Sequence, residues 1–311
     1  LYVPSLWIEL LFANLILLMI WRAYKAVSNP TWWNVVWFGV SAGLTSLCKG
    51  VALLFPVFMA GAVFVLYQFK LNVFSGLNKT ALLKIIFVPT SIMLITIFPW
   101  TARNYIVSGG WTLVSSGVGV EFFRGNIFAE QNSFLLQKSI PEIFDIAKKQ
   151  ENQIIQQHGI QRSTSREEEL FDSRKGKKID EVFNSMMIRY IVFHPYQFAV
   201  KIVKQIPAFW MRGETTKKSI GFVFIALMAF IPFIKGFMIL KRHSILVYIV
   251  LICIIYFNLI YAAVLAWARY SMPLYPPMLI IGVYWITQLV ENRKNRSKLR
   301  LQSVNQNSWG E

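Results

Sequence analysis

Residues 81–100 read ALLKIIFVPTSIMLITIFPW, and Lys84 is the only charged residue among them. A membrane-spanning helix needs about 20 consecutive, largely apolar residues, so this stretch predicts one complete crossing. The same pattern recurs on both sides of it along the chain. We place the other spans near 4–21, 33–48, 51–69, 219–240, 244–265 and 271–290. The sequence therefore predicts an all-α, polytopic transmembrane helix bundle of about seven spans.

The overall composition and charge support the same class. Of the 311 residues, 55% are hydrophobic, which is too apolar for an ordinary soluble domain of this length. A net charge of +17 can indicate nucleic-acid binding, but 12 of the 15 acidic residues lie between Thr101 and Lys217, where 16 basic residues nearly balance them. Most of the remaining positive charge sits in short segments beside apolar runs, as on the cytoplasmic side of membrane proteins. We therefore expect membrane lipids, and no nucleic acid, as partners.

The basic segments orient the predicted spans. If the seven spans alternate, the segments after Arg22, Lys70 and Lys235 and the tail after Glu291 share one side, which the positive-inside rule makes cytoplasmic. The chain then divides into transmembrane helices at 1–100, an external helical loop at 101–217, transmembrane helices at 218–290 and a basic cytoplasmic tail at 291–311. Its composition is compatible with a bacterial inner (cytoplasmic) membrane.

The external segment has helical periodicity with start and stop signals. Residues 139–159 predict one helix, which ends at Gly159. A second is expected from about 163 to the break at His194-Pro195. A third, at 196–210, is predicted to be amphipathic, with Phe198 on its apolar side and Lys201 elsewhere, and to suit the membrane interface.

Four ionisable residues lie near the predicted external ends of the spans: Glu9, Lys49, Arg103 and Arg269. Ionisable groups at membrane depth cost several kcal/mol unless they are paired or face water, so they are candidates for function. Three cations and a carboxylate beside aromatic residues such as Tyr270 suit the phosphate or pyrophosphate of a lipid. The alternative is structural: the cations extend to lipid headgroups and Glu9 neutralises one of them.

The sequence FPWTARN at 98–104 predicts where the helix of residues 81–100 ends. We expect it to end near Pro99 and Trp100, which delivers Arg103, with Asn104 beside it, to the level of a lipid phosphate. The competing interpretation is that both residues only cap the last carbonyl groups of the helix and contact headgroups.

The next stretch, SGGWTLVSSGVGVEFFRGN at 108–126, contains five glycines. Glycine lets the backbone approach a ligand closely, so Arg124 and Asn126 are candidates to hydrogen-bond hydroxyl groups or phosphate. A plain loop turn explains the same glycines equally well. Neither a P-loop nor a dinucleotide-binding fingerprint is present. The two cysteines and three histidines have no metal-ligand spacing, so we expect no metal and no cofactor.

Four stretches resemble a known family. FPWTARNYIVSGGWTLVSSGVGVEFFRGN at 98–126 resembles the motif that opens the large external loop of bacterial GT-C glycosyltransferases related to dolichyl-phosphate-mannose protein mannosyltransferases and aminoarabinose transferases. GVSAGLTSLCKGVALLFPVFMAG at 39–61 resembles that family's Gly-rich segment with a basic residue before a new span. EVFNSMMIRYIVFHPYQFAVKIVKQIPAFW at 181–210 resembles the helix pair that closes the loop, and RYSMPLYPPMLIIG at 269–282 resembles the entry to a late span.

The resemblance implies a membrane enzyme that moves a sugar from a polyprenyl-phosphate-linked donor to an acceptor, which is a lipid, a glycan or a protein, at the external face. It makes Lys49, Arg103 and Arg269 candidates for holding the donor phosphate, and Glu9 a candidate for orienting the acceptor or the sugar. The family's catalytic acid lies in the first external loop. Because the chain opens at Leu1 inside an apolar run, we expect that loop to be missing from this fragment, and the catalytic base with it.

Three other interpretations remain open on the sequence, one of which is a non-catalytic membrane subunit or a degenerate relative of the family. A ligase or polymerase of surface polysaccharide also uses polyprenyl-linked substrates, but with a pyrophosphate-linked glycan. A transporter or flippase of lipid-linked sugars is favoured by the glycines around Gly50, which suit a broken helix. It is disfavoured because one half of the chain does not repeat the other and because the charged positions gather at one face.

Overall fold

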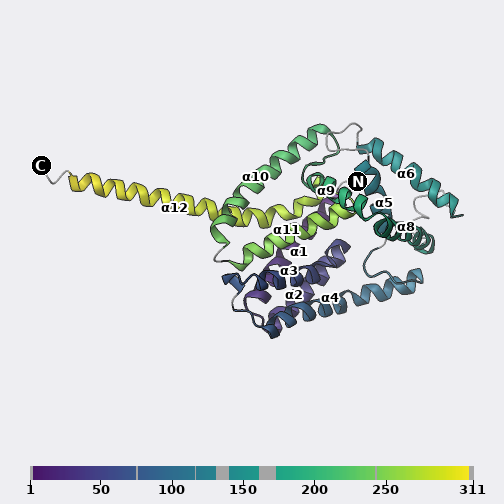
Figure 1. Cartoon of the computed structure of the whole chain (residues 1–311), viewed down its shortest axis with the longest axis horizontal. Coiled ribbons are helices and arrows are strands. Elements are labelled where there is room, and N and C mark those ends of the chain that lie inside the picture. Colours follow the sequence, from purple (N-terminus) through teal and green to yellow (C-terminus); the bar gives the residue numbers. More distant parts are fainter. Residues whose placement is uncertain are drawn as a thin grey trace.

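The computed structural model describes residues 3–74, 76–115, 117–130, 140–160, 173–241 and 244–307. Within these ranges the chain forms α-helices and short 3-10 helices and no strand (Figure 1), so the predicted all-α class is confirmed. The elements are α1 (Val3–Ser28), α2 (Trp32–Cys48), η1 (Gly50–Ala52), α3 (Phe55–Gln68), η2 (Asn72–Phe74), α4 (Lys79–Ser108), α5 (Val118–Glu130), α6 (Ile140–Gln157), α8 (Ser173–Phe193), α9 (Pro195–Met211), α10 (Thr216–Leu240), α11 (Ile245–Ala263), η3 (Ala268–Leu274) and α12 (Tyr275–Asn307).

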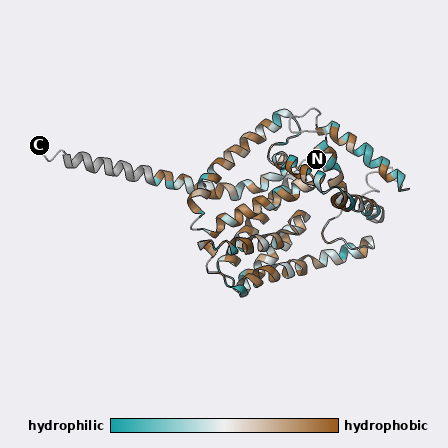
Figure 2. Ribbon diagram, in the orientation of Figure 1, coloured by the Kyte–Doolittle hydropathy of each residue, from teal (hydrophilic) through white to brown (hydrophobic). Residues whose placement is uncertain are grey.

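Six segments of the described chain are long and apolar enough to cross a membrane, and Figure 2 shows their predominantly hydrophobic colouring. They are Ile8–Ser28, Gly50–Gln68, Lys79–Val107, Thr216–Leu240, Ile245–Ala263 and Ala268–Glu291. The chain is thus a multi-pass membrane protein. The predicted span at 33–48 is not among these six. It corresponds to α2, whose 17 residues extend about 26 Å at 1.5 Å per residue, which is shorter than a hydrocarbon layer of about 30 Å.

Although α2 is short, it returns the chain along α1 to the opposite end of the bundle. The Thr45 hydroxyl near the end of α2 donates to the Leu15 carbonyl in the first half of α1, so the two helices are antiparallel. Lys25, Lys70, Lys79 and Lys241 belong to turns at one end, called here the basic end. The opposite end, which carries α5, α6 and α8, is called the loop end (Figure 1).

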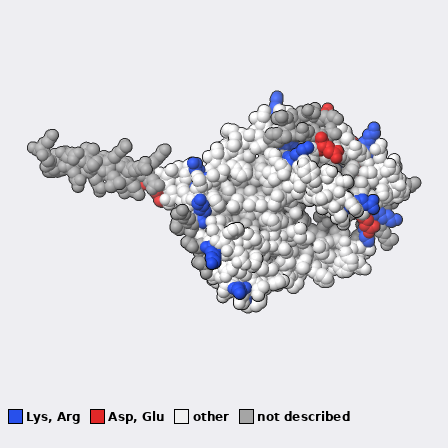
Figure 3. Space-filling view, in the orientation of Figure 1, with Lys and Arg blue, Asp and Glu red and all other residues white. Residues whose placement is uncertain are grey.

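The two ends of the bundle differ in the sign of their charged side chains. On the face shown in Figure 3, Lys and Arg side chains line the lower left edge of the body, whereas basic and acidic side chains occur together on the opposite side. This distribution follows the one deduced from the sequence. Which end faces the cytoplasm stays a prediction of the positive-inside rule.

Small residues allow the close contact between α2 and α4. A Cβ added to Gly39 would lie 2.7 Å from the Pro89 carbonyl oxygen, and one added to Gly43 would lie 2.6 Å from Thr96 Cβ. Helix pairs in membranes use such residues because packing takes the place of the hydrophobic effect. The glycines of α2 therefore contact α4.

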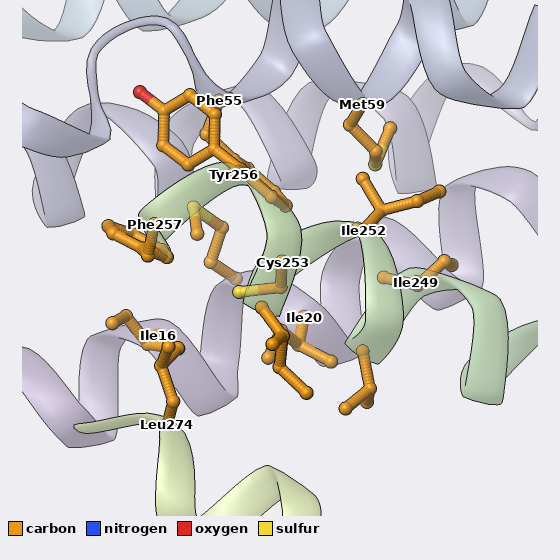
Figure 4. Packing of buried hydrophobic residues seen from close by; sticks show 14 of the residues in the cluster. Ile16, Ile20, Phe55, Met59, Ile249, Ile252, Cys253, Tyr256, Phe257 and Leu274 are labelled. Atoms are coloured by element: carbon orange, nitrogen blue, oxygen red, sulfur yellow. The ribbon is translucent and has the colours of Figure 1, made fainter. Parts of the chain in front are cut away.

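The core of the bundle lies between α1, α3 and α11. Figure 4 shows Ile16 from α1, Phe55 and Met59 from α3, and Cys253 and Phe257 from α11 converging on one another. All five are fully buried or nearly so. This core fixes the relative positions of the helix ends that form the site described below.

Helix α4 is longer than predicted. It continues through Pro99 to Ser108 and ends at Gly109, which adopts the left-handed conformation at φ 69°. The segment that follows folds back onto its last turns, because Trp100 Nε1 donates to the Val114 carbonyl at 2.9 Å and the Thr101 hydroxyl to the Leu113 carbonyl at 2.7 Å. The expectation that the helix ends near Trp100 is therefore wrong.

The loop end confirms some predictions and corrects others. Helix α6 lies within the predicted range of 139–159, and α8 ends at Phe193, before the predicted break; the predicted start near 163 falls outside the described residues. Residues 118–126, by contrast, form the first part of α5 rather than a loop. Glycine content alone misled the prediction, because Gly119 and Gly125 serve close packing within a helix: a Cβ on Gly125 would lie 1.7 Å from the Val264 carbonyl oxygen.

The face of α9 that packs against α5 is polar, whereas its apolar side is left at least partly exposed, so the position of this helix in the membrane interface stays a prediction. Lys201 and Gln205 are 3% and 0% exposed, whereas Ile206 is 37% exposed. The Lys201 ammonium donates to the Phe122 carbonyl at 3.2 Å, and the Gln205 side-chain amide donates to the Gly125 carbonyl at 2.8 Å. Polar side chains occupy this buried face because they satisfy backbone carbonyls of α5.

Candidate functional site

Glu9 and Lys49 form an ion pair at the loop end of the bundle. Antiparallel packing of α1 and α2 brings Glu9, near the start of α1, beside Lys49, which caps the end of α2. The Lys49 ammonium and the Glu9 carboxylate are 2.5 Å apart, and the two side chains are only 18% and 22% exposed. The ammonium also lies 5.0 Å from the ring centroid of Phe12 and 5.5 Å from that of Tyr270. A partly dehydrated pair of this kind has a fixed position.

Arg269 reaches the same region from the other half of the chain. The 3-10 helix η3 holds it with its guanidinium 5.1 Å from the Tyr270 ring centroid and 5.2 Å from that of Trp267. Tyr270 in turn stacks on Tyr261 of α11, with ring centroids 4.7 Å apart. Three of the four predicted ionisable residues, Glu9, Lys49 and Arg269, therefore gather around Tyr270.

Arg103 and Asn104 have different surroundings. Arg103 is exposed on α4, where its guanidinium lies 4.9 Å from the Trp100 ring centroid and contacts the Asn104 side-chain oxygen at 3.5 Å. The Asn104 amide donates to the carbonyls of Thr112 and Val114 at 3.3 and 3.4 Å, which fastens the following segment to the helix. A role for Arg103 in phosphate binding stays a prediction, whereas Asn104 has a clear structural one.

Arg124 and Asn126 project from α5. Arg124 is held between two carboxylates, with contacts of 2.7 Å to Glu121 and 2.9 Å to Glu151. Because Glu151 is 2% exposed, this guanidinium is needed to neutralise a buried charge. The side-chain oxygen of Asn126 is buried and has no hydrogen-bond partner in the described part of the chain. Arg124 is thus occupied, whereas Asn126 keeps a free acceptor.

Arg212, at the end of α9, was missed by sequence reasoning. The Ala268 amide donates to its carbonyl at 3.0 Å, which ties this residue to η3. Its side chain is 6% exposed, yet its Nε and Nη1 atoms have no hydrogen-bond partner among the described residues. Burial lowers the pKa of Arg212 to about 10, so the guanidinium remains charged at neutral pH. An unpaired buried charge is expensive and is expected where a ligand supplies the counter-charge.

A pocket of about 310 Å³, called here the Arg212 pocket, opens beside this guanidinium. Its polar lining includes Arg269, which also contacts Tyr270, and the ion pair of Lys218 and Glu214, both of which line the pocket. Trp267 also lines the pocket, and its buried indole N–H has no described hydrogen-bond partner.

The other wall of the Arg212 pocket is apolar. Phe222 and Ile225 of α10 and Met272 of η3 form it, and all three belong to segments that are apolar enough to span the membrane. The pocket therefore has hydrogen-bond donors for an anion on one side and a surface suited to a hydrocarbon chain on the other. The sequence offered one signal for it: Arg212 and Gly213 stand between an amphipathic helix and the next span.

Among the described residues, no group of three or more His, Cys, Asp or Glu side chains could hold a metal ion. Comparisons with protein-family models, with curated proteins and with solved structures find no match for this chain. We therefore infer function from the geometry of the Glu9–Lys49 pair, Arg269 and the Arg212 pocket.

Proposed function

We propose that this protein is a membrane glycosyltransferase that uses a polyprenyl-phosphate-linked sugar as donor and binds the donor phosphate in the Arg212 pocket. The observation that carries the proposal is the buried guanidinium of Arg212 beside an apolar wall, with two nitrogens that have no hydrogen-bond partner among the described residues and the Phe128 ring centroid 5.6 Å away. A planar guanidinium matches phosphate oxygens, and the free indole N–H of Trp267 adds a second donor. The wall formed by Phe222, Ile225 and Met272 suits the first isoprene units of the carrier.

The chemistry of transfer fits this arrangement. An acceptor hydroxyl or amine gives up its proton to a general base and attacks the anomeric carbon. The bond from that carbon to the phosphate oxygen breaks, and negative charge grows on the departing lipid phosphate. Fixed cations in a partly dehydrated cavity stabilise such charge more effectively than water does. Arg212 and Arg269 are the proposed source of this stabilisation.

The Glu9–Lys49 pair has a second proposed role. It lies beside Tyr270, which Arg269 also contacts, so the pair adjoins the proposed phosphate site. Glu9 offers carboxylate oxygens that accept hydrogen bonds from sugar or acceptor hydroxyls, and Lys49 fixes their position. Tyr270 and the free acceptor of Asn126 are further candidates for contacts with the sugar.

Phosphate recognition is tested by comparing undecaprenyl phosphate with undecaprenol as ligands of the purified protein, using native mass spectrometry. Loss of a hydrogen bond to a charged group costs about 1.5–3 kcal/mol, so Arg212→Gln is expected to weaken binding of the phosphate about 10- to 150-fold. Binding of the alcohol should be unaffected. Lys204→Gln, which removes an exposed charge from the same helix, is the matched control. Equal affinities for phosphate and alcohol would refute the phosphate site.

Catalysis is tested separately in membranes that contain the protein. A transferase releases free polyprenyl phosphate only when an acceptor is present, whereas a transporter moves the lipid-linked sugar unchanged. Use of a pyrophosphate-linked glycan alone would instead favour the ligase or polymerase.

A further inference from the structure

A second and larger pocket lies at the basic end of the bundle, between α3 and α4. Its volume is about 740 Å³, within the usual range for sites that bind small molecules. Phe64, Leu71, Phe74 and Leu82 give it an apolar wall. Most of a ligand bound there would therefore have to be hydrocarbon.

Two lysines line this pocket: Lys70 follows the end of α3, and Lys79 is the first residue of α4. Both are exposed, and neither ammonium has a hydrogen-bond or ion-pair partner among the described residues. None of the residues that line the pocket is acidic. The charge of the pocket thus complements one anionic group at its mouth.

The backbone at Lys70 points to a specific role for this side chain. Lys70 is the only non-glycine residue of the described chain with positive φ, at 51°, and it follows the C-terminal cap of α3. Glycine or asparagine usually occupies that position because a Cβ is disfavoured in the left-handed conformation. A lysine there retains the strain, and this lysine lines the pocket.

We infer that this pocket binds an anionic phospholipid from the membrane leaflet at the basic end, with the phosphate between Lys70 and Lys79 and an acyl chain along the apolar wall. The site is separate from the Arg212 pocket at the other end of the bundle and does not depend on sugar transfer. A bound lipid would fill the space between α3 and α4 and brace these two helices. Phosphatidylglycerol supplies the required charge, whereas phosphatidylcholine with the same acyl chains carries no net charge.

The experiment is native mass spectrometry of the full chain in detergent, titrated with phosphatidylglycerol or phosphatidylcholine. Each lysine near a membrane surface contributes about fivefold to the binding of anionic lipid, so Lys70→Gln combined with Lys79→Gln is expected to weaken phosphatidylglycerol binding by roughly 25-fold. Phosphatidylcholine binding should stay the same. The matched control is Lys235→Gln combined with Lys241→Gln, which removes the same charge from exposed positions outside the pocket.

A third variant tests the apolar part. Leu83 lines the pocket and is 55% exposed, so Leu83→Trp adds bulk there without disturbing the core and should reduce phosphatidylglycerol binding while both lysines remain. The inference is overturned if the pocket double variant binds phosphatidylglycerol as the wild type does. It is equally overturned if the control double variant loses as much affinity, because the lysines would then act only as a diffuse basic surface.

Discussion

Replacing Lys201 with methionine should stabilise the protein at neutral pH. Lys201 is 3% exposed, and its ammonium contacts the Phe122 carbonyl at 3.2 Å and the Phe122 ring, whose centroid is 3.6 Å away. No carboxylate among the described residues forms an ion pair with this ammonium group. Methionine keeps the length of the side chain and removes the need to bury a charge.

The magnitude follows from the pKa. Burial lowers the pKa of Lys201 from 10.5 to about 7, while the unfolded chain keeps the ordinary value. Between these two values the unfolded state binds the proton and the folded state does not, so stability rises with pH. Below pH 7 both states are protonated and the full penalty is present, about 5 kcal/mol at 1.36 kcal/mol per unit. Above pH 10.5 the penalty has disappeared, and Lys201→Met then loses only a hydrogen bond worth about 1 kcal/mol.

The assay is thermal unfolding of the detergent-solubilised protein between pH 6 and 10. At about 2 °C per kcal/mol for a chain of this size, Lys201→Met is expected to raise Tm by up to roughly 10 °C at pH 6. This gain should shrink steadily as pH rises. Lys204→Met, at an exposed position of the same helix, is the control and should leave the pH profile unchanged. Parallel profiles for wild type and Lys201→Met would refute the reasoning, because they would mean that the amine is solvated in the folded state.

Three further substitutions test the packing at the loop end by Tm measurements. Gly125→Ala should destabilise the protein by more than about 3 kcal/mol, because the new Cβ would meet the Val264 carbonyl oxygen at 1.7 Å; an unchanged Tm would contradict the close approach of α5 to the end of α11. Glu151→Gln should cost about 1–3 kcal/mol, because Arg124 loses its charged acceptor at 2.9 Å; an unchanged Tm would argue against a contribution of this ion pair. Gly109→Ala should cost about 1 kcal/mol, because φ is 69° there; a stabilising effect would argue against the left-handed end of α4.

Long apolar segments in the sequence were enough to predict most of the helices. Long segments such as 81–100 have one stable form in a membrane, since a helix satisfies its own backbone hydrogen bonds, and this requirement is local. The predicted ranges failed where a contact between segments decides the boundary. Helix α4 runs on to Ser108 because residues 113 and 114 accept hydrogen bonds from its last turns, and no local signal at Pro99 and Trp100 reveals this.

The candidate site was partly predictable for a related reason. Glu9, Lys49 and Arg269 stand out in the sequence because charge near an apolar run is costly, and alternation of the spans puts them at the same end. Alternation does not specify which helices are neighbours, so Arg103 was grouped with them although its described contacts are with Trp100 and Asn104.

By itself the sequence determined the class of protein, the apolar helices and the end of the bundle at which charges gather, because each depends on hydropathy along one segment. Only the tertiary structure decided which polar groups are buried and whether they have partners. Arg124 meets Glu121 and Glu151, whereas two nitrogens of the buried Arg212 guanidinium have no acceptor in the described part of the chain. Burial and pairing are properties of neighbours brought together from distant segments, and the proposed phosphate site depends on both.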